Sequence, residues 1–373
     1  MNDFKMDFAD EQALFLPGAD AALLVNEPWA PVVITRAQID EEVRRLADGP
    51  APANGRRASL IVHPKSQSHA PGLAPGIQVM LSVLRPGERT APFRHNATEV
   101  NFCIRGSGRF HAEGRELPFG TFDVWNTPSY QPYMVVNDSD DLQVRLTYSN
   151  APLLRAMQIY VTEEVGEIAP GAPDEAEHEA DDARRTSPYG TFEIGNGALL
   201  MPYERLINPP AVASPLLHWP WERVEAELLK LETLGADYIG RRLYLLYNPM
   251  TGRTNGTTPS FFATMTIRPA DIVDRPHRHT SAAINYYFRG SGRSTVAGRT
   301  YEWNAGDLML SAPGWAVHNH ASYGERVYEL TVQDQPLNIA MESLLWQENL
   351  KAPPALLGSQ SGFETNRRAA TVA

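Results

Sequence analysis

A five-residue segment, RGSGR, occurs twice in this chain, at 105–109 and again 184 residues later at 289–293. The residues before each copy also match, with TEVNFCI before the first and AAINYYF before the second. Further along, Pro152-Leu153 matches Pro336-Leu337 at the same separation. Solenoid repeats recur at about 20–50 residues. The much larger separation here predicts two copies of a whole domain.

Both copies consist of short runs in which apolar and polar residues alternate, separated by Gly, Pro and Asn. Alternation with a period of two is typical of strands with one buried face, and many short strands with regular turns are typical of sandwiches and barrels. The GSGR segments and GRTYEWNAGDLML mark turns between such strands. The sequence therefore predicts two small β-barrels.

The composition limits the class of protein and its partners. With 373 residues, of which 43% are hydrophobic and 21% charged, the chain is globular and long enough for two to three domains. Its net charge of −11 argues against nucleic acid or an anionic membrane as a partner. A single cysteine, Cys103, cannot form an internal disulfide, which favours a cytoplasmic location. The sequence shows neither an apolar run that could span a membrane nor the pattern of a secretory signal.

The order of patterns along the chain predicts five segments. Thr35 and Gln38 form a capping box for a helix through about Ala47. A second amphipathic helix is predicted after Pro220, with an apolar stripe that packs on the core and consists of Val224, Leu228, Leu231 and Leu234. The predicted segments are an N-terminal arm with one helix (1–76), a first barrel (77–161), an acidic linker (162–214), a helix with the second barrel (215–345) and a C-terminal tail (346–373).

Three histidines indicate a metal site in the second barrel. His277 and His279 are two residues apart on a predicted strand, so their side chains point to the same face. His318 follows about forty residues later and can complete a set of three imidazole ligands. Imidazole suits Zn, Cu, Fe and Ni, so the ligand set narrows the metal without identifying it. The alternative is that these are ordinary polar residues at a strand edge.

These residues carry a resemblance to a known family. The spacing HxH, a Glu or its substitute, Gly and then PxxxxH is similar to the two cupin motifs. The chain resembles the bicupin gentisate, salicylate and 1-hydroxy-2-naphthoate dioxygenases. The matching residues are His277-Arg278-His279-Thr280, Ala283 at the Glu position, Trp315 to His320, Tyr247-Asn248-Pro249 and Thr251-Gly252. The resemblance implies an all-β fold with a few helices, built from two tandem double-stranded β-helix (jelly-roll) barrels.

The same resemblance implies an activity. The protein would be an Fe(II)-dependent dioxygenase that cleaves the ring of a hydroxylated aromatic compound with O2. The resemblance also implies a cytoplasmic protein that assembles as a homo-oligomer, commonly a tetramer. Zinc or nickel would serve the main alternative, a metal-dependent isomerase, lyase or hydrolase that acts on a small oxyacid without redox change. A binding or regulatory cupin without turnover is a third possibility.

Strand parity predicts which residues surround the metal. Asn285 and Tyr287 should line the cavity, with Arg289 toward the far end of the barrel. The resembling dioxygenases usually have Arg six residues after the second His, where it pairs with the substrate carboxylate. Here that residue is Asn285, and Asn cannot replace the bidentate contacts of Arg. Either Arg268, Arg275 or Arg326 binds the carboxylate, or the substrate has none.

Three further residues are predicted near the metal. His320 shares the face of His318 and matches a histidine of the family that can accept a phenolic proton. Asp334 is placed to accept a hydrogen bond from an imidazole, which would orient the ring. Trp315 can stack on an aromatic substrate or close the end of the barrel.

The first barrel retains only part of this set. It aligns Phe93, His95 and Tyr133 with the three histidines, and of the usual ligands only His95 and Glu99 remain. This predicts a structural barrel without metal, with a second functional pocket at His95, Glu99 and Tyr133 as the alternative. The N-terminal cupin usually carries the metal in the resembling family, so this chain departs from its pattern.

Overall fold

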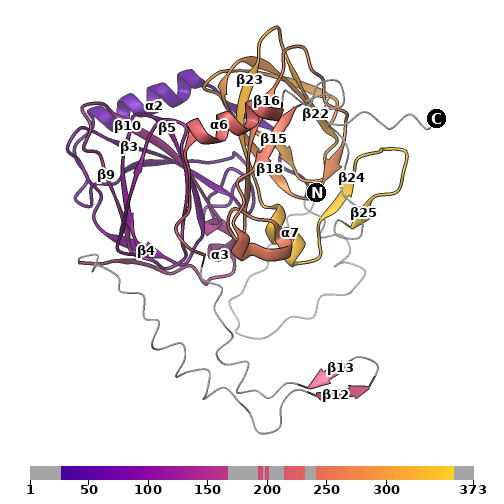
Figure 1. Cartoon of the computed structure of the whole chain (residues 1–373), viewed down its shortest axis with the longest axis horizontal. Coiled ribbons are helices and arrows are strands. Elements are labelled where there is room, and N and C mark those ends of the chain that lie inside the picture. The colour runs from indigo at the N-terminus through magenta and orange to yellow at the C-terminus, as the bar shows by residue number, and fades with distance from the viewer. Residues whose placement is uncertain (1–26, 167–191, 196–197, 201–213, 232–240, 357–373) are drawn as a thin grey trace, which may run out of the picture.

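The computed structural model describes residues 27–166, 192–195, 198–200, 214–231 and 241–356. Two β-barrels stand side by side, the first drawn from indigo to magenta and the second from orange to yellow (Figure 1). The predicted all-β class with a few helices is confirmed. No helix in these described ranges is both long and apolar enough to cross a membrane.

Two sheets form the first barrel. The larger has the strand order β14-β8-β5-β10-β3-β2 and the smaller β11-β4-β9-β6-β7. The bounds are β2 (Arg57–Ile61), β3 (Gln78–Leu84), β4 (Phe93–His95), β5 (Glu99–Arg105), β6 (Gly108–Ala112), β7 (Arg115–Phe119), β8 (Val124–Thr127), β9 (Tyr133–Val136), β10 (Gln143–Ser149), β11 (Thr162–Glu164) and β14 (His218–Trp219).

The second barrel repeats this plan. Its large sheet has the order β1-β21-β18-β23-β16-β15 and its small sheet β20-β19-β22, and a third sheet has the order β17-β24-β25. The bounds are β1 (Val32–Ile34), β15 (Arg242–Leu245), β16 (Phe262–Arg268), β17 (Arg278–His279), β18 (Ala282–Arg289), β19 (Ser291–Val296), β20 (Arg299–Asn304), β21 (Leu308–Pro313), β22 (His318–Ser322), β23 (Val327–Gln333), β24 (Leu345–Gln347) and β25 (Ala355–Leu356). Separately, β12 (Phe192–Gly195) pairs with β13 (Ala198–Leu200).

The repeated RGSG segment forms the same turn in both barrels. Gly106 and Gly290 each have φ of +81°, a left-handed conformation that L side chains rarely adopt. A Cβ at Gly106 would lie 2.4 Å from the carbonyl oxygen of Leu142, and one at Gly290 would lie 2.6 Å from that of Arg326. Both the conformation and the close backbone approach therefore require glycine.

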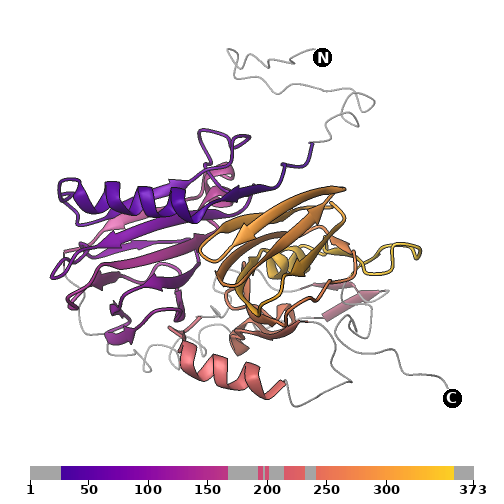
Figure 2. The same ribbon diagram turned by 90° about the horizontal axis from the view of Figure 1, so that it is seen from above.

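Short helices cover the barrels. α2 (Arg36–Asp48) begins with the predicted capping box of Thr35 and Gln38. α6 (Trp221–Lys230) buries Leu228 in the core as predicted, while the predicted stripe residue Leu234 lies outside the described residues. Figure 2 shows α2 and α6 on opposite sides of the barrel pair. The remaining helices are α3 (Ala151–Ala156), the 3-10 helix η2 (Pro249–Thr254) and α7 (Gln335–Ala340).

Aromatic rings fill the space between the barrels. Tyr286 and Phe288 of β18 point out of the second barrel, as strand parity predicts, and lie 5.7 and 5.8 Å from the ring of Phe102 in the first barrel. Trp221 of α6 packs edge-on against Phe288 at 5.1 Å. One continuous apolar core therefore joins the outer faces of the two large sheets.

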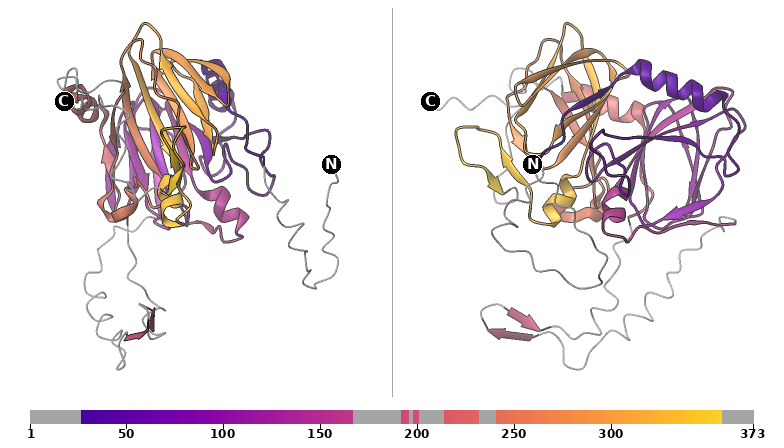
Figure 3. Two further views of the ribbon diagram at one scale, coloured as in Figure 1. Left: turned by 90° about the vertical axis from the view of Figure 1, so that its right-hand side faces the viewer. Right: turned by 180° about the vertical axis from the view of Figure 1, so that it is seen from behind.

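The barrels do not coincide with the predicted segment boundaries. In the predicted arm, β1 joins the second barrel and β2 joins the first. β14 lies within the predicted segment 215–345 but extends the first barrel, because its backbone hydrogen-bonds to β8. In the predicted tail, β24 pairs with β17, and this yellow hairpin lies on the side of the second barrel away from the first (Figure 3). Most of the acidic linker lies outside the described residues.

The turn glycines provide a stability test. Gly290→Ala should lower the free energy of unfolding by roughly 3 kcal/mol or more, because a left-handed alanine would also press on the backbone at Arg326. Gly298→Ala is the matched control, because Gly298 has φ of +79° but nothing within 4 Å of an added Cβ. The control should lose only about 1–2 kcal/mol. Urea unfolding midpoints measure both, and equal midpoints would contradict the role of the close approach.

Candidate metal centre and substrate cavity

The imidazoles of His277, His279 and His318 converge inside the second barrel. Their candidate ligand atoms all lie within 4.8 Å of one another, and all three side chains are buried. The backbone places them together, because His277 and His318 exchange hydrogen bonds of 3.0 and 2.8 Å across the gap between their segments. The strand parity that selected these residues therefore brings them to one point.

Each of the three rings is oriented by a backbone carbonyl. The Nδ1 atoms of His277, His279 and His318 lie 3.0, 2.9 and 2.9 Å from the carbonyl oxygens of Arg275, Ser281 and Ala316. A carbonyl only accepts, so each Nδ1 carries the proton and each Nε2 keeps a lone pair. Three such lone pairs, held by outer hydrogen bonds, are the donor set that a transition metal requires.

Burial keeps these rings neutral. It lowers the pKa of His277 to about 4 and of His318 to about 3, and it holds the pKa of His279 well below its ordinary value. The nearby Arg241 guanidinium lowers all three further. Metal ligation requires the unprotonated imidazole, so the site is ready for a cation at neutral pH without losing protons first.

The histidines border a cavity of about 230 Å³. A cavity of about 150 Å³ is enough to hold benzene, so this one has room for a single substituted ring. The other lining residues include Arg241, Phe262, Thr264, Ala283, Asn285, Ser311, His320, Thr331, Gln333 and Trp346. The cavity is thus apolar on some sides and carries polar groups close to the metal ligands.

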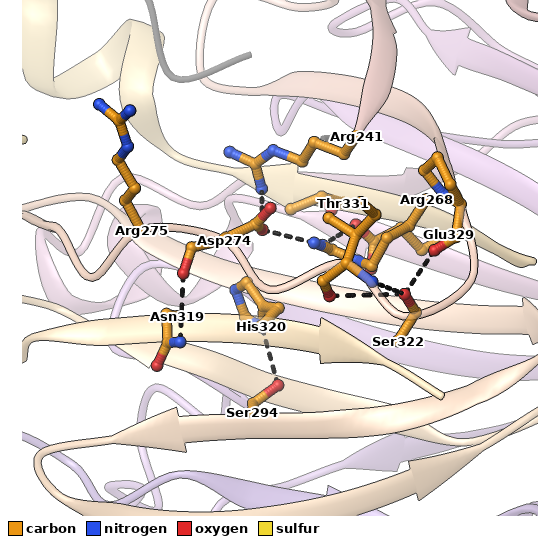
Figure 4. A network of polar contacts seen from close by, with 12 residues as sticks. Arg241, Arg268, Asp274, Arg275, Ser294, Asn319, His320, Ser322, Glu329 and Thr331 are labelled. Atoms are coloured by element: carbon orange, nitrogen blue, oxygen red, sulfur yellow. Dashed lines mark hydrogen bonds and ion pairs between the residues drawn. The ribbon is translucent and has the colours of Figure 1, made fainter. Parts of the chain in front are cut away.

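Asn285 and His320 lie where they were predicted, in the cavity wall. Asn285 donates to the Thr331 hydroxyl at 2.8 Å and accepts from Ser311, so its amide is held in place. His320 Nδ1 lies 2.7 Å from the Ser294 hydroxyl (Figure 4), which leaves Nε2 on the other side of the ring. Burial, followed by the charge of Arg268, lowers the pKa of His320 well below its ordinary value, so the ring is neutral.

Tyr287 and Arg289 do not line the cavity, contrary to the prediction. Tyr287 is fully buried at the far end of the barrel, where its ring stacks on Trp303 at 3.7 Å. Between Tyr287 and Arg289 the register to β23 shifts by one residue. This bulge turns Arg289 to the outer surface, where it lies 3.5 Å from Glu225. Beyond the bulge, the alternation of inward and outward side chains therefore no longer predicts which way a side chain points.

Arg268 lies inside the second barrel, but its guanidinium is already paired with two carboxylates. Its guanidinium donates to Asp274 and, at 3.1 Å, to Glu329 (Figure 4). Despite complete burial, these carboxylates raise its pKa, and the pKa of Asp274 is correspondingly lowered. A guanidinium paired with two buried carboxylates has little capacity for a substrate carboxylate. The prediction that Arg268 binds substrate is therefore wrong.

Arg275, Arg326 and Trp315 are not among the residues that line the cavity. Arg275 borders a separate surface groove, and in Figure 4 its side chain points away from His320. Arg326 lies 3.4 Å from the Tyr328 hydroxyl. The ring of Trp315 lies beneath the guanidinium of Arg278 at 4.4 Å. Neither predicted carboxylate-binding arginine nor the predicted stacking tryptophan therefore reaches the space beside the histidines.

Asp334 has a structural position, and among the described residues its carboxylate is hydrogen-bonded to no imidazole. Its Oδ1 accepts from the backbone N–H of Ala282 at 2.8 Å. Asn150 makes the same bond to Thr98 at 2.9 Å in the first barrel, 184 residues earlier, so both residues close the end of a strand. His279 Nδ1 donates instead to Ser281, whose carbonyl and hydroxyl oxygens both lie 2.9 Å away, and that hydroxyl donates in turn to Gln333 at 3.1 Å. By strand parity Gln333 faces inward, whereas Asp334 already begins α7.

The sequence patterns missed two residues of the cavity. Trp346 of β24 stacks on His277 and His279, with ring centroids 5.5 and 5.1 Å apart. Arg241, directly before β15, lines the cavity and lies 3.6 Å from Asp274, beyond hydrogen-bonding distance (Figure 4). Both come from segments outside the repeated barrel strands that carry the histidines, so no motif indicated them.

The first barrel has a different interior at the equivalent place. His95 Nε2 lies 3.1 Å from a Glu99 oxygen and 3.3 Å from the Tyr133 hydroxyl. Among the residues that the structure describes, three or more histidine, cysteine or acidic side chains converge in metal-binding geometry only at His277, His279 and His318.

Two family models match the chain, one in each barrel. Residues 80–149 match the cupin domain, and residues 264–362 match the AraC-like ligand binding domain. The chain is 26% identical over 324 residues to a gentisate 1,2-dioxygenase of Haloferax sp, which covers 83% of each protein. It is 24% identical over 268 residues to gentisate 1,2 dioxygenase 1 of Aquipseudomonas alcaligenes, covering 70% of this chain and 72% of the relative.

A solved structure shows the same fold. The salicylate 1,2-dioxygenase of Pseudaminobacter salicylatoxidans superposes with a TM-score of 0.69 at 19% identity, over 87% of this chain and 89% of that one. Two barrels with matching family models, relatives aligned across both barrels and this shared architecture agree with one another. In sequence over both barrels and in fold, the chain is similar to the bicupin gentisate-type dioxygenases.

Proposed function

We propose that this protein is an Fe(II)-dependent dioxygenase that cleaves the ring of a hydroxylated aromatic carboxylate with O2. The observation that carries the proposal is the set of three buried, neutral imidazoles whose Nε2 atoms face a cavity of about 230 Å³. Relatives named gentisate and 5-nitrosalicylic acid 1,2-dioxygenase support the reaction class. The non-redox alternative is not favoured, because the curated relatives are dioxygenases.

His277, His279 and His318 would hold the ion. Three neutral ligands leave the double positive charge of Fe(II) uncompensated and coordination positions open. When bound, Fe(II) would supply the redox chemistry that lets O2 react with an aromatic ring. The remaining residues position the substrate and move its protons. Assembly as a homo-oligomer, commonly a tetramer, and a cytoplasmic location stay predictions.

Arg241 would bind the substrate carboxylate. It lines the cavity, and its charge acts on all four histidines there. Its closest carboxylate, Asp274, is 3.6 Å away and is already bonded to Arg268. Within the described ranges Arg241 has only this 3.6 Å ion pair, so its guanidinium keeps N–H groups for bidentate contacts with an anionic substituent. This supports a carboxylated substrate, although Asn285 replaces the arginine usual in the family.

Two further residues complete the proposed roles. His320 Nε2 would accept the phenolic proton when the substrate hydroxyl reaches the metal, because its ring is neutral and its Nδ1 is held by Ser294. Trp346 covers the faces of two metal-binding imidazoles and would keep water from them.

The reaction class is tested by oxygen uptake. Protein supplied with Fe(II) should consume O2 in the presence of gentisate or salicylate, without NADH, because the aromatic ring supplies the electrons. An oxygen electrode measures the rate, and the same protein supplied with Zn²⁺ is the control. Absence of uptake across gentisate, salicylates, hydroxynaphthoates, hydroquinones and aminophenols would contradict the proposal.

The metal ligands are tested by counting ions. His318→Ala should reduce bound iron from one ion per chain to a small fraction, because two imidazoles hold a divalent ion weakly. His95→Ala, a buried histidine of the first barrel, is the matched control and should retain one ion. Elemental analysis after gel filtration gives the ratio. If His95→Ala loses the iron and His318→Ala retains it, the ion is bound in the first barrel and the proposed ligand set is wrong.

Arg241 is tested by comparing substrates. Arg241→Gln should raise KM for a carboxylated substrate by roughly 10–150-fold, the equivalent of a charged hydrogen bond of about 1.5–3 kcal/mol. KM for any hydroquinone that is turned over should change little, because it has no carboxylate. Arg275→Gln, whose side chain borders a different groove, is the control. A similar KM increase in both variants would show that Arg241 does not bind the substrate carboxylate.

A further inference from the structure

The duplication also repeats the places where helices α2 and α6 meet the barrels, on opposite sides of the molecule (Figure 2). The backbone N–H of Arg36, the first residue of α2, donates to Asp307 at 2.6 Å. The backbone N–H of Trp221, the first residue of α6, donates to Asp123 at 2.7 Å. Asp123 and Asp307 are 184 residues apart, which is the period of the repeat. The two helices are therefore anchored at equivalent points, and the two junctions can be compared residue by residue.

Aromatic rings fill the junction at α6. The ring of Trp221 lies 6.1, 5.1 and 5.7 Å, between centroids, from the rings of Phe122, Phe288 and Tyr328. Phe122 and Phe288 in turn lie 4.5 Å apart. The space between α6 and the two barrels is therefore occupied by the protein's own side chains.

The junction at α2 has residues without rings at the same positions. The residues 184 positions away from Phe122, Phe288 and Tyr328 are, in that order, Gly306, Ile104 and Val144. Counted from the start of each helix, Trp221 corresponds to Arg36. These four smaller or more flexible residues all border a cavity of about 210 Å³. The cavity thus lies where the other junction is filled by rings.

The charges at the two junctions differ as well. At α6, Arg289 lies 3.5 Å from Glu225, the fifth residue of the helix. Its equivalent, Arg105, borders the cavity at α2. There the fifth residue of the helix is Asp40, which is paired with Arg36 at 3.4 Å. Arg105 forms no ion pair with any of the described residues. The cavity therefore has an exposed cation at its edge without a counter-ion from the described chain.

Tyr286 contributes a polar group to the same cavity. Only 6% of its surface is exposed, and its hydroxyl has no hydrogen-bond partner among the described residues. The charges of Asp40, Arg36 and Arg105, which also border the cavity, act on this hydroxyl. Burial raises the pKa of Tyr286, so the hydroxyl keeps its proton and can donate it in a hydrogen bond. A buried hydroxyl without a partner costs free energy, so this position favours a ligand with an acceptor group.

The rest of the cavity wall is mainly aliphatic. Branched side chains come from α2 and from the first barrel, at Ile39, Val43, Ile104 and Val144. Phe122 and Phe288 also border the cavity, but their rings are already packed on each other. A wall of this kind suits a flexible alkyl chain better than a flat ring. A cavity of about 150 Å³ holds the six carbons of benzene, so this one has room for roughly eight.

We propose that the cavity between α2 and the two barrels binds an aliphatic monocarboxylate of roughly eight carbons. Its carboxylate would accept hydrogen bonds from Arg105 and Tyr286, as Glu225 serves Arg289 at the other junction. Its chain would occupy the space that the rings occupy at α6. The site lies outside the interiors of both barrels. The inference does not depend on the proposed function, because it concerns binding alone.

Octanoate is the probe, and isothermal titration calorimetry of the full, iron-loaded chain measures its binding. Arg105→Gln should weaken binding about fivefold, the effect of one exposed charge. Tyr286→Phe should weaken it by about the same factor, because one hydrogen bond is lost. Val144→Tyr introduces the residue of the equivalent position in the second barrel and should abolish binding by filling the cavity. Arg109→Gln removes another arginine of the first barrel and, as the control, should bind like the wild type.

Two further ligands test the chemical class. Butyrate lacks half of the chain and should bind at least about tenfold more weakly than octanoate, because it buries less apolar surface. 1-Octanol keeps the chain without the charge and should bind about fivefold more weakly. Octanol that binds as well as octanoate would contradict the role of Arg105.

Three results would overturn the proposal. They are a wild-type chain that binds no octanoate, binding that Val144→Tyr and Arg105→Gln leave unchanged, and binding that Arg241→Gln abolishes, which would assign octanoate to the metal cavity. Thermal unfolding midpoints show whether each variant is folded. Should Val144→Tyr fail to fold, Arg105→Gln and Tyr286→Phe still decide the question, because they change only an exposed charge and an unpartnered hydroxyl. Failed oxygen uptake would leave all these results unchanged.

Discussion

The site depends on three hydrogen bonds from imidazole Nδ1 atoms to backbone carbonyls. Rigid strand and turn segments carry those carbonyls, so the direction of each Nε2 lone pair is determined by the backbone. Burial then removes the proton that would compete with a metal. Orientation and protonation thus both follow from the fold of the second barrel, and the cavity beside the histidines receives its chemistry from side chains held by further hydrogen bonds.

The duplicated architecture separates what the fold needs from what the chemistry needs. Asn150 and Asp334 close equivalent strand ends, and Gly106 and Gly290 form equivalent turns, so these residues are structural in both barrels. The inner faces have diverged, since His277 and His318 correspond to Phe93 and Tyr133. The repeated residues maintain the shared fold, whereas the side chains of the two interiors have diverged.

Much of the architecture and the centre of the site could be predicted from the sequence. The repeat predicted two barrels, and strand parity placed His277, His279 and Asn285 on one inner face. Parity failed at Arg289, because the bulge after Tyr287 is a register shift that alternation does not encode. Arg241 and Trp346 could not be found, since their positions follow from how segments outside the repeat pack against the barrel. Burial of Arg268 between two carboxylates is likewise a property of tertiary packing.

The strand β1 has a consequence for how the molecule is assembled. It forms the edge of the second barrel's large sheet, although the whole first barrel follows it in the chain, and the first residue of α2 bonds to Asp307 in that same barrel. The C-terminal half translated alone would expose the backbone of β21 as an open edge, which invites intermolecular pairing. The two halves are therefore interlocked, and gene duplication here has produced a unit that neither limited proteolysis nor domain dissection can divide cleanly.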